Sequence, residues 1–255
     1  MKRIIAISLN NFKESVRQRI FIIIIIFGIL LLITSFFLFP LSVGEQSKII
    51  RDFGLSIITF LNIVILIITG GTLIYKEIEK RTIYITLSAP VRRNEVIIGK
   101  FIGLFLVILI NLISMSILHQ ILIFFTDKKF DPQILISLFP FLFEISIMIA
   151  LMILFSSFSS YLFSSFMGAI IYLIGHSIES LKEFAEISKS TFLKIISYIF
   201  YYLLPNLEIF NIKNEVVYKN LPSLNYFLFS TSYGIAYTIF LLILSIIIFE
   251  KREFK

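Results

Sequence analysis

The sequence contains no cysteine and no tryptophan, and only 15% of its 255 residues are charged. Without cysteine the chain can form neither disulfides nor thiolate metal sites. The absence of tryptophan indicates a biased composition and carries no mechanism. The shortage of charge, together with 58% hydrophobic residues, excludes a soluble globular domain. The sequence therefore predicts an all-α, polytopic integral membrane protein.

Six apolar stretches approach the length of about 20 residues that a helix needs to cross a bilayer. They are Ile20 to Phe39, Phe53 to Tyr75, Phe101 to Phe125, Ile134 to Phe155, Tyr161 to Ser177 and Tyr233 to Phe249. An even number of spans places both termini on one side of the membrane. The first stretch follows a basic segment, as in a signal peptide, but it is too long and lacks a small-residue cleavage pattern, so we expect a retained span.

The distribution of Lys and Arg indicates the orientation of the chain in the membrane. Most of the 23 Lys and Arg residues lie in the N-terminal segment, in the connector between the second and third spans, and at the C-terminus. Elsewhere the bases are balanced by acids. By the positive-inside rule, the termini and this connector are cytoplasmic, in a multi-pass protein of the cell (inner) membrane. The net charge of +7 then reflects topology and attraction to anionic lipid, and we expect no nucleic-acid partner.

Two segments outside the spans carry helical patterns within the single membrane domain, residues 1–255. Residues 1–19 space apolar positions among basic ones, which favours a helix in the membrane interface or an ordinary basic flank. Residues 178–232 form the longest predicted extracytoplasmic segment. Within it, Phe192 to Leu204 is too short to span and predicts an interfacial or re-entrant helix, whereas Asn211 to Asn225 predicts a surface loop.

The connector, residues 76–100, is the only densely charged segment between two long apolar runs. Asn94 is suited to cap a helix there, and Glu95 complements the helix dipole in the first turn. That helix is expected to continue directly into the third span. Pro90 disfavours helical geometry before it, so a bend follows Ser88. The pattern predicts a helix, an elbow and a second helix at the membrane surface.

The connector also resembles a known family. Glu77 to Thr82, Leu87 to Pro90, Arg93 to Glu95 and Gly99-Lys100 are similar to the segment after the second span of ABC-2-type transporter permeases. The resemblance is to the six-span branch that includes the permeases of nitrous-oxide-reductase maturation. It implies that the segment docks on a separate cytoplasmic ATPase subunit, which binds ATP and Mg. This chain would then need no cofactor and would not be an enzyme.

The resemblance also implies roles for individual residues. It places Glu77, Glu79 and Thr82 in the helix behind the coupling element, Leu87, Ser88, Pro90, Arg92 and Arg93 at the tip facing the ATPase, and Gly99 and Lys100 at the return into the third span. Two permease copies, identical or related, would flank a pathway, mostly for export. In related permeases, short re-entrant helices cap its outer side. The alternative is a basic connector that only binds lipid.

Two catalytic readings find little support in the sequence. A phosphate-binding P-loop needs glycine five residues before a Gly-Lys pair and Ser or Thr after it, but Asn94 and Phe101 occupy these positions. An intramembrane hydrolase needs a nucleophile with a base, or paired metal ligands, whereas His119 and His176 are isolated in the sequence.

The predicted spans hold a few polar residues. The candidate pathway residues are Glu144, Asn62, Asn111 and Ser114, although polar side chains in spans more often bond neighbouring helices. Glu144 must be protonated, paired or hydrated, since an unpaired carboxylate in hydrocarbon costs several kcal/mol. We therefore expect Glu144 to belong to the translocation route, to act as a proton-sensitive latch, or to form a buried hydrogen bond to Ser, Tyr or Lys.

Glycines predict where helices approach closely. Gly70-Gly71 interrupts the second span, and Gly99 and Gly103 form a small-xxx-small pair at the start of the third. For Gly70-Gly71 a role in the pathway is the alternative. The function that the sequence favours is an ABC permease subunit. The alternative is a non-transporting scaffold or mechanotransmission subunit that serves an extracytoplasmic partner through residues 178–232.

Overall fold

The computed structural model describes residues 2–17, 20–38, 46–79, 92–128, 130–188, 190–218 and 220–252. Every regular element in these ranges is helical, which confirms the all-α prediction. The elements are α1 (Lys2–Arg17), α2 (Ile20–Leu38), α3 (Gln46–Thr72), α4 (Tyr75–Glu79), α6 (Arg93–Asp127), α7 (Pro132–Phe158), α8 (Tyr161–His176), α9 (Ile178–Ile187), α10 (Thr191–Leu203), the 3-10 helix η2 (Glu208–Phe210), α11 (Lys213–Val217) and α12 (Leu224–Lys251).

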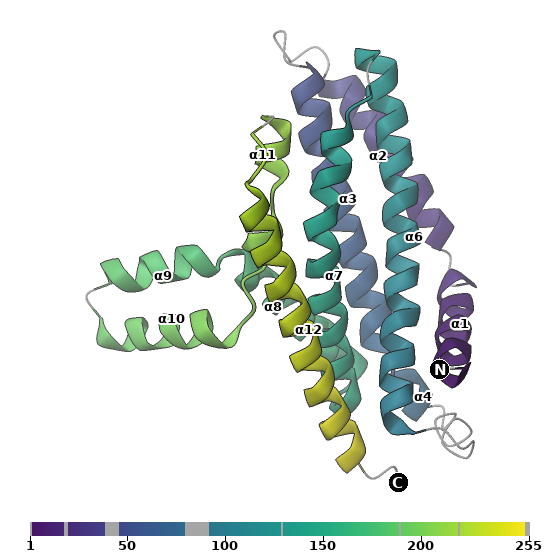
Figure 1. The fold of residues 1–255 in the computed structure, drawn as a ribbon, viewed down its shortest axis with the longest axis vertical. Helices are drawn as coiled ribbons and strands as arrows, with labels where there is room; N and C mark the ends of the chain where they lie inside the picture. The colour runs from purple at the N-terminus through teal and green to yellow at the C-terminus, as the bar shows by residue number, and fades with distance from the viewer. Residues whose placement is uncertain are drawn as a thin grey trace.

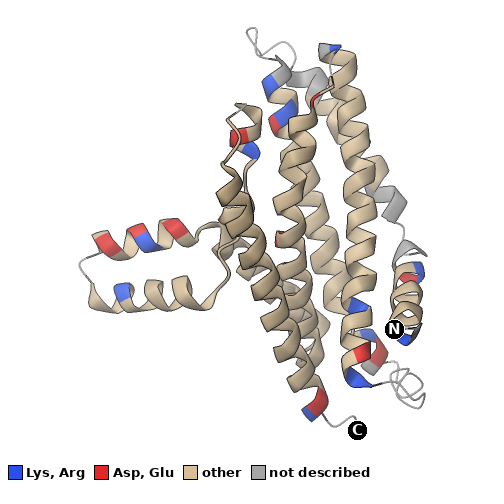
Figure 2. Ribbon diagram, in the orientation of Figure 1, with Lys and Arg blue, Asp and Glu red and all other residues tan. Residues whose placement is uncertain are grey.

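The long helices run along the long axis of the molecule, as Figure 1 shows. Both chain termini and α4 lie at the lower end in that view, which we call the terminal end; the opposite end is the far end. Charged residues gather near the two ends and on the α9–α10 hairpin, and the middle of the long helices is nearly free of them (Figure 2). This distribution suits a bundle whose middle lies in hydrocarbon.

Four predicted spans are long and apolar enough to cross a membrane, namely α3, α6, α7 and α12. The first predicted span is the 19-residue helix α2. The fifth corresponds to α8, which has 16 residues and bends by 62° into α9. A second bent pair joins Thr191–Leu203 to Glu208–Val217. Among the described residues there are therefore four candidate spans, or up to six if each bent pair crosses once, and α2 is counted in neither number.

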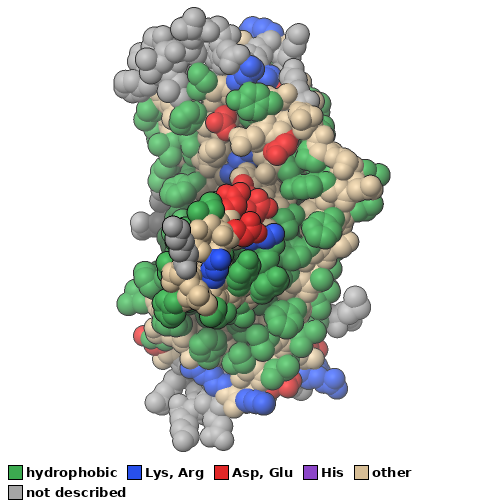
Figure 3. Space-filling view, turned by 90° about the vertical axis from the view of Figure 1, so that its left-hand side faces the viewer, with side chains coloured by type: hydrophobic (Ala, Val, Ile, Leu, Met, Phe, Trp, Pro, Cys, Tyr) green, Lys and Arg blue, Asp and Glu red, His purple; other side chains and the backbone are tan. Residues whose placement is uncertain are grey.

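The α9–α10 hairpin projects sideways from the bundle, about midway along its long axis (Figure 1). The physical reason is the length of α8, whose 16 residues reach only about 24 Å, less than the thickness of hydrocarbon, about 30 Å. The chain therefore turns out of the bundle before the far end. In Figure 3 the hairpin faces the viewer as a charged patch in an apolar surface.

The two helices of the hairpin differ in how much apolar surface they expose. On α9 the exposed side chains include the acidic Glu179 and Glu183 beside the apolar Phe184 and Ile187, whereas those of α10 are mainly apolar, as at Phe192. The short helix predicted at 192–204 is confirmed as α10.

The surface loop predicted over Asn211 to Asn225 is wrong in part. The chain there forms α11, whose Val216 and Val217 are buried, and α12 begins at Leu224, upstream of the predicted Tyr233. Tertiary burial of these two valines overrides the local polarity that suggested a loop.

Helix α7 is the centre of the bundle, since α3, α6, α8 and α12 all pack against it. Its residues from Ile147 to Met152 are buried. Glycines make the contacts close, as predicted: a Cβ at Gly70 would lie 2.7 Å from the Cβ of Met152, and one at Gly168 would lie 2.4 Å from its sulfur. Gly71 similarly faces Ser165 of α8.

The N-terminal helix α1 packs along the start of α6. The Ser8 hydroxyl donates to the carbonyl of Gly99 (3.0 Å), and the Asn11 amide donates to that of Lys100 (3.2 Å). The small-xxx-small pair therefore makes the helix contact predicted for it. Two residues of the predicted apolar stripe, Ile5 and Leu9, are exposed instead and are available to lipid.

The α1–α6 contact gives a testable prediction. A Cβ at Gly103 would lie 2.9 Å from both the Cβ of Asn11 and the carbonyl oxygen of Ser8. We expect Gly103→Ala to push α1 away and to destabilise the contact by about 1–3 kcal/mol. Amide hydrogen exchange of α1 should be faster than in the wild type. Gly28→Ala is the matched control, because no atom lies within 4 Å of a Cβ there; equal protection of α1 in both variants would contradict the prediction.

Candidate functional site

The structure describes six of the ten residues predicted for coupling. Glu77 and Glu79 lie on α4, Arg92 precedes α6, and Arg93, Gly99 and Lys100 lie on its first turns. Thr82, Leu87, Ser88 and Pro90 lie outside the described residues. The six belong to two neighbouring segments at the terminal end, where α1 and the end of α12 also lie (Figure 1).

Lys100 joins α6 to the end of α3. Its ammonium is buried and donates to the carbonyl oxygen of Leu73 (2.6 Å) and to Glu77 Oε1 on α4 (2.8 Å). The carbonyls at a helix end lack partners within the helix, so a buried ammonium there satisfies a group that hydrocarbon would leave unbonded. The charge on Lys100 therefore fixes the bend from α3 into α4 against α6.

The first turn of α6 differs from the prediction at its cap. The helix begins at Arg93, and the carboxylate of Glu95 accepts a hydrogen bond from the backbone amide of Arg92 (2.9 Å). Asn94 lies inside the helix, so its predicted role as the cap is wrong. Glu95 serves instead, because a carboxylate at the third helical position reaches back to the free amide. As predicted, this helix continues without a break through the third span.

Arg93 holds the end of α12. Its Nη1 lies 2.8 Å, 2.9 Å and 2.8 Å from the carbonyl oxygens of Phe249, Glu250 and Arg252. The guanidinium also lies over the ring of Phe249, 6.0 Å from its centroid. Arg252 in turn donates to the carbonyl of Ser157, at the end of α7. Arg93 and Arg252 together thus link the start of α6 to the last turns of α12 and α7.

Three of the four candidate pathway residues bond to one another or to their own helices. Asn111 Nδ2 donates to Asn62 Oδ1 (3.2 Å), both buried between α6 and α3. Asn62 donates in turn to the carbonyl of Ile58 (2.8 Å), and Ser114 to that of Ile110 (2.8 Å). These bonds give the three residues a structural role.

Glu144 has a partner that the sequence analysis missed. Its Oε1 lies 3.1 Å from His176 Nε2, and His176 Nδ1 lies 2.8 Å from Glu208 Oε2. Asn211 completes the group by donating to Glu208 Oε1 (2.8 Å). The interpretation of His176 as isolated is wrong, because its partners lie 32 residues away on either side along the chain. No local spacing signals this contact, which only the fold brings together.

Comparison with known families identifies the chain. Residues 5–254 match the profile of the ABC-2 family transporter proteins. The chain belongs to this family. No curated protein matches the permease. As an ABC-2 permease it is the membrane component of an ABC transporter, which implies an ATPase partner, and it is not itself an enzyme.

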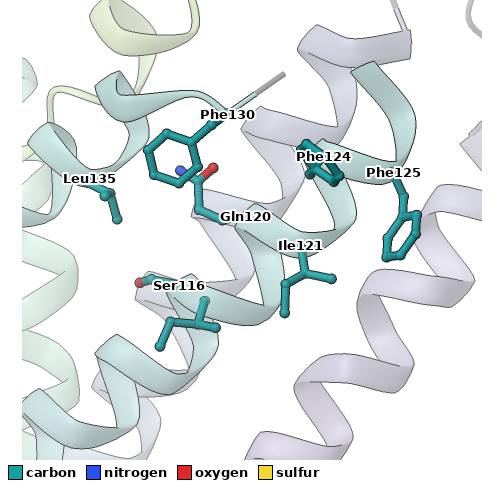
Figure 4. Close-up of a pocket in the computed structure, with 8 residues that line it drawn as sticks. Ser116, Gln120, Ile121, Phe124, Phe125, Phe130 and Leu135 are labelled. Atoms are coloured by element: carbon teal, nitrogen blue, oxygen red, sulfur yellow. The ribbon is translucent and has the colours of Figure 1, made fainter. Parts of the chain in front are cut away.

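The permease has an apolar pocket of about 570 Å³ on the side of α6, near the far end (Figure 4). Its lining residues are Ser116, Ile117, Gln120, Ile121, Phe124, Phe125, Phe130 and Leu135. Gln120 donates to the carbonyl of Asp131 (2.7 Å), and its own Oε1 has no hydrogen-bond partner among the described residues. Apart from Ser116 and Gln120, the side chains that line the pocket are apolar.

The Lys100 joint gives the second prediction. Lys100→Met retains the apolar stem and removes the ammonium that Leu73 and Glu77 share. We expect the free energy of unfolding to fall by about 1.5–3 kcal/mol, as for loss of a buried hydrogen bond to a charged group. Thermal unfolding of the permease in detergent, with hydrogen exchange of residues 73–79, measures this. Lys13→Met, on the exposed side of α1, is the control; a melting temperature equal to that control would show that the ion pair stabilises nothing.

Proposed function

We propose that this permease receives ATP-driven movement from a separate cytoplasmic ATPase through residues 76–100, and uses it to export a substrate between two permease copies. The ATPase subunit binds ATP and Mg. The termini and the coupling segment face the cytoplasm, since most of the basic residues lie there. The α9–α10 hairpin, which leaves the bundle about midway along its long axis, is assigned to the cap of the route.

One observation carries this proposal: the start of α6 is tied to three other spans. Lys100 binds the turn between α3 and α4, and Arg93 binds the end of α12. Through Arg252 this end is bonded to α7. A force applied to the connector therefore reaches α3, α12 and α7 through hydrogen bonds to backbone atoms. Rigid elements joined in this way transmit displacement as a unit.

The geometry separates docking residues from transmitting residues. Arg92 is exposed, whereas the Arg93 guanidinium contacts the backbone of α12. We therefore assign Arg92, together with Pro90 and its neighbours, to the surface that meets the ATPase. Arg93 passes the movement on. This revises the prediction, which placed both arginines at the tip.

The third prediction uses this separation. In mild-detergent purifications from the native host, Pro90→Ala with Arg92→Glu should lose a stoichiometric ATPase subunit, identified by mass spectrometry. Arg93→Lys should retain the subunit but reduce the ATP-driven movement of α12, because the lysine side chain is one atom shorter and lacks the planar group that lies over the Phe249 ring. Spin labels on Ile110→Cys and Ile247→Cys report that movement, since both side chains are exposed and the chain has no other cysteine.

Lys251→Ala is the matched control, because this exposed lysine shares the last turn of α12. It should behave as the wild type in both measurements. If the protein purifies without an ATPase, or retains it in the Pro90 and Arg92 variant, the coupling assignment is wrong and the scaffold function is favoured. If Arg93→Lys leaves the movement of α12 unchanged, the transmission role of Arg93 is wrong.

A further inference from the structure

The Glu144–His176–Glu208 cluster joins three elements at one point. Glu144 comes from α7, His176 is the last residue of α8, and Glu208 is the first residue of η2. The exposed fraction of the side chains rises along the cluster, from 3% for Glu144 to 21% for His176 and 35% for Glu208. The cluster thus reaches from the interior of the bundle to its surface.

The distances from His176 to the two carboxylates determine how many protons the cluster holds. Both ring nitrogens of His176 lie within hydrogen-bonding distance of a carboxylate oxygen. A carboxylate only accepts hydrogen bonds, and a neutral imidazole has one N–H. Two bonds therefore need two hydrogens, present either as an imidazolium between two carboxylates or as a neutral imidazole beside one protonated carboxyl. Either arrangement holds one proton more than a neutral histidine with two carboxylates.

The neighbouring groups favour this extra proton. With it, the cluster carries a charge of −1, and without it −2. The facing charged groups are Lys213 of α11, which interacts electrostatically with Glu144, Glu208 and Asp52 of α3. The Tyr172 ring packs edge-on against the imidazole, 4.7 Å away, and Tyr226 of α12 interacts electrostatically with Glu208, with Glu215 of α11 and with Glu179 of α9. One lysine can neutralise a charge of −1, but not −2 in a partly buried site.

The cluster holds a segment of chain in place. Leu207 donates its backbone amide to the carbonyl of Gly175 (3.0 Å), and a Cβ at Gly175 would lie 2.7 Å from the Leu207 side chain. Asn206 donates its amide to the hydroxyl of Tyr233 on α12 (2.9 Å). Residues 205–212 therefore lie tightly between the end of α8 and α12, and Glu208 is linked through His176 to Glu144 of α7.

We propose that Glu144, His176 and Glu208 form a proton-binding site that fastens residues 205–212 to α7 and α8, and that loss of the shared proton releases this segment. The proton leaves to solvent through Glu208, the most exposed member. The remaining lone pair of the imidazole then faces a carboxylate, and one of the two bonds breaks. Higher pH consequently favours the released state, because the fastened state binds one more proton.

The variant that tests this proposal is Glu208→Gln. Its amide oxygen can still accept from Asn211, and its amide nitrogen can donate to Nδ1 of a neutral His176, whose Nε2–H donates to Glu144. Both contacts are then satisfied without the extra proton. The variant should stay fastened at high pH. A merely structural carboxylate predicts the reverse, a loss of protection at every pH.

The fourth prediction is measured on the full-length permease alone, in lipid nanodiscs, from about pH 5 to about pH 10, a range that extends above the ordinary titration of histidine because two carboxylates retain the shared proton. Hydrogen exchange of residues 205–212 is compared between wild type and Glu208→Gln at each pH, so that the intrinsic pH dependence of exchange cancels. We expect equal exchange at the acidic limit, and wild-type exchange about tenfold faster at the alkaline limit. Because no ATPase is present, the outcome is independent of the proposed coupling function.

Two further variants complete the experiment. Glu186→Gln, the same change on exposed α9, should follow the wild type, whereas His176→Gln should exchange rapidly at every pH. The chain has two histidines, so ring ¹⁵N labelling reports His176 directly, with the His176→Gln variant assigning its signals. A ratio of exchange rates that does not change with pH, or faster exchange in Glu208→Gln than in the wild type, would overturn the proposal.

Discussion

Hydrocarbon offers no hydrogen bonds, and this constraint determines where the charged groups of the permease lie. Lys100 binds Glu77 and a free carbonyl of the α3–α4 turn, Arg93 binds the carbonyls that end α12, and Arg51 pairs with Asp131 at 3.1 Å. Each of these contacts joins two elements at a helix end. Because an unpaired charge is costly in a membrane, these charged side chains connect helices, and removing one is expected to separate the two elements that it joins.

Between these ion pairs and hydrogen bonds at the helix ends, the bundle is held together by close packing. Gly70 and Gly168 let α3 and α8 approach Met152 of α7, and Gly99 and Gly103 do the same for α1 on α6. Lipid is as apolar as the helix surfaces, so burial alone does not drive the helices together, and small residues increase the contact between backbones. The glycines thus determine which helices are neighbours, and the charges determine how their ends are connected.

The sequence predicted the features that depend on local pattern. Apolar runs located the long helices, and the glycines located points of close approach, although their partner helices came only from the structure. The same reasoning failed at one helix start and at one contact between residues that are distant in the sequence. Asn94 looked like a cap, yet Glu95 caps the helix and Arg93 is its first residue. His176 looked isolated because Glu144 and Glu208 reach it only in the folded chain.

Helix α7 connects the two ends of the molecule. Glu144 lies in its interior and binds His176, and the carbonyl of Ser157 at its terminal end binds Arg252 of the α12 end that Arg93 holds. The two positions are about 20 Å apart along one helix, at about 1.5 Å per residue. Linkage is reciprocal: if displacement of α7 strains the Glu144–His176 bond, protonation of the cluster must resist that displacement by the same free energy. The shared proton at Glu144 and a force applied at the terminal end would then act on the same rigid helix, α7.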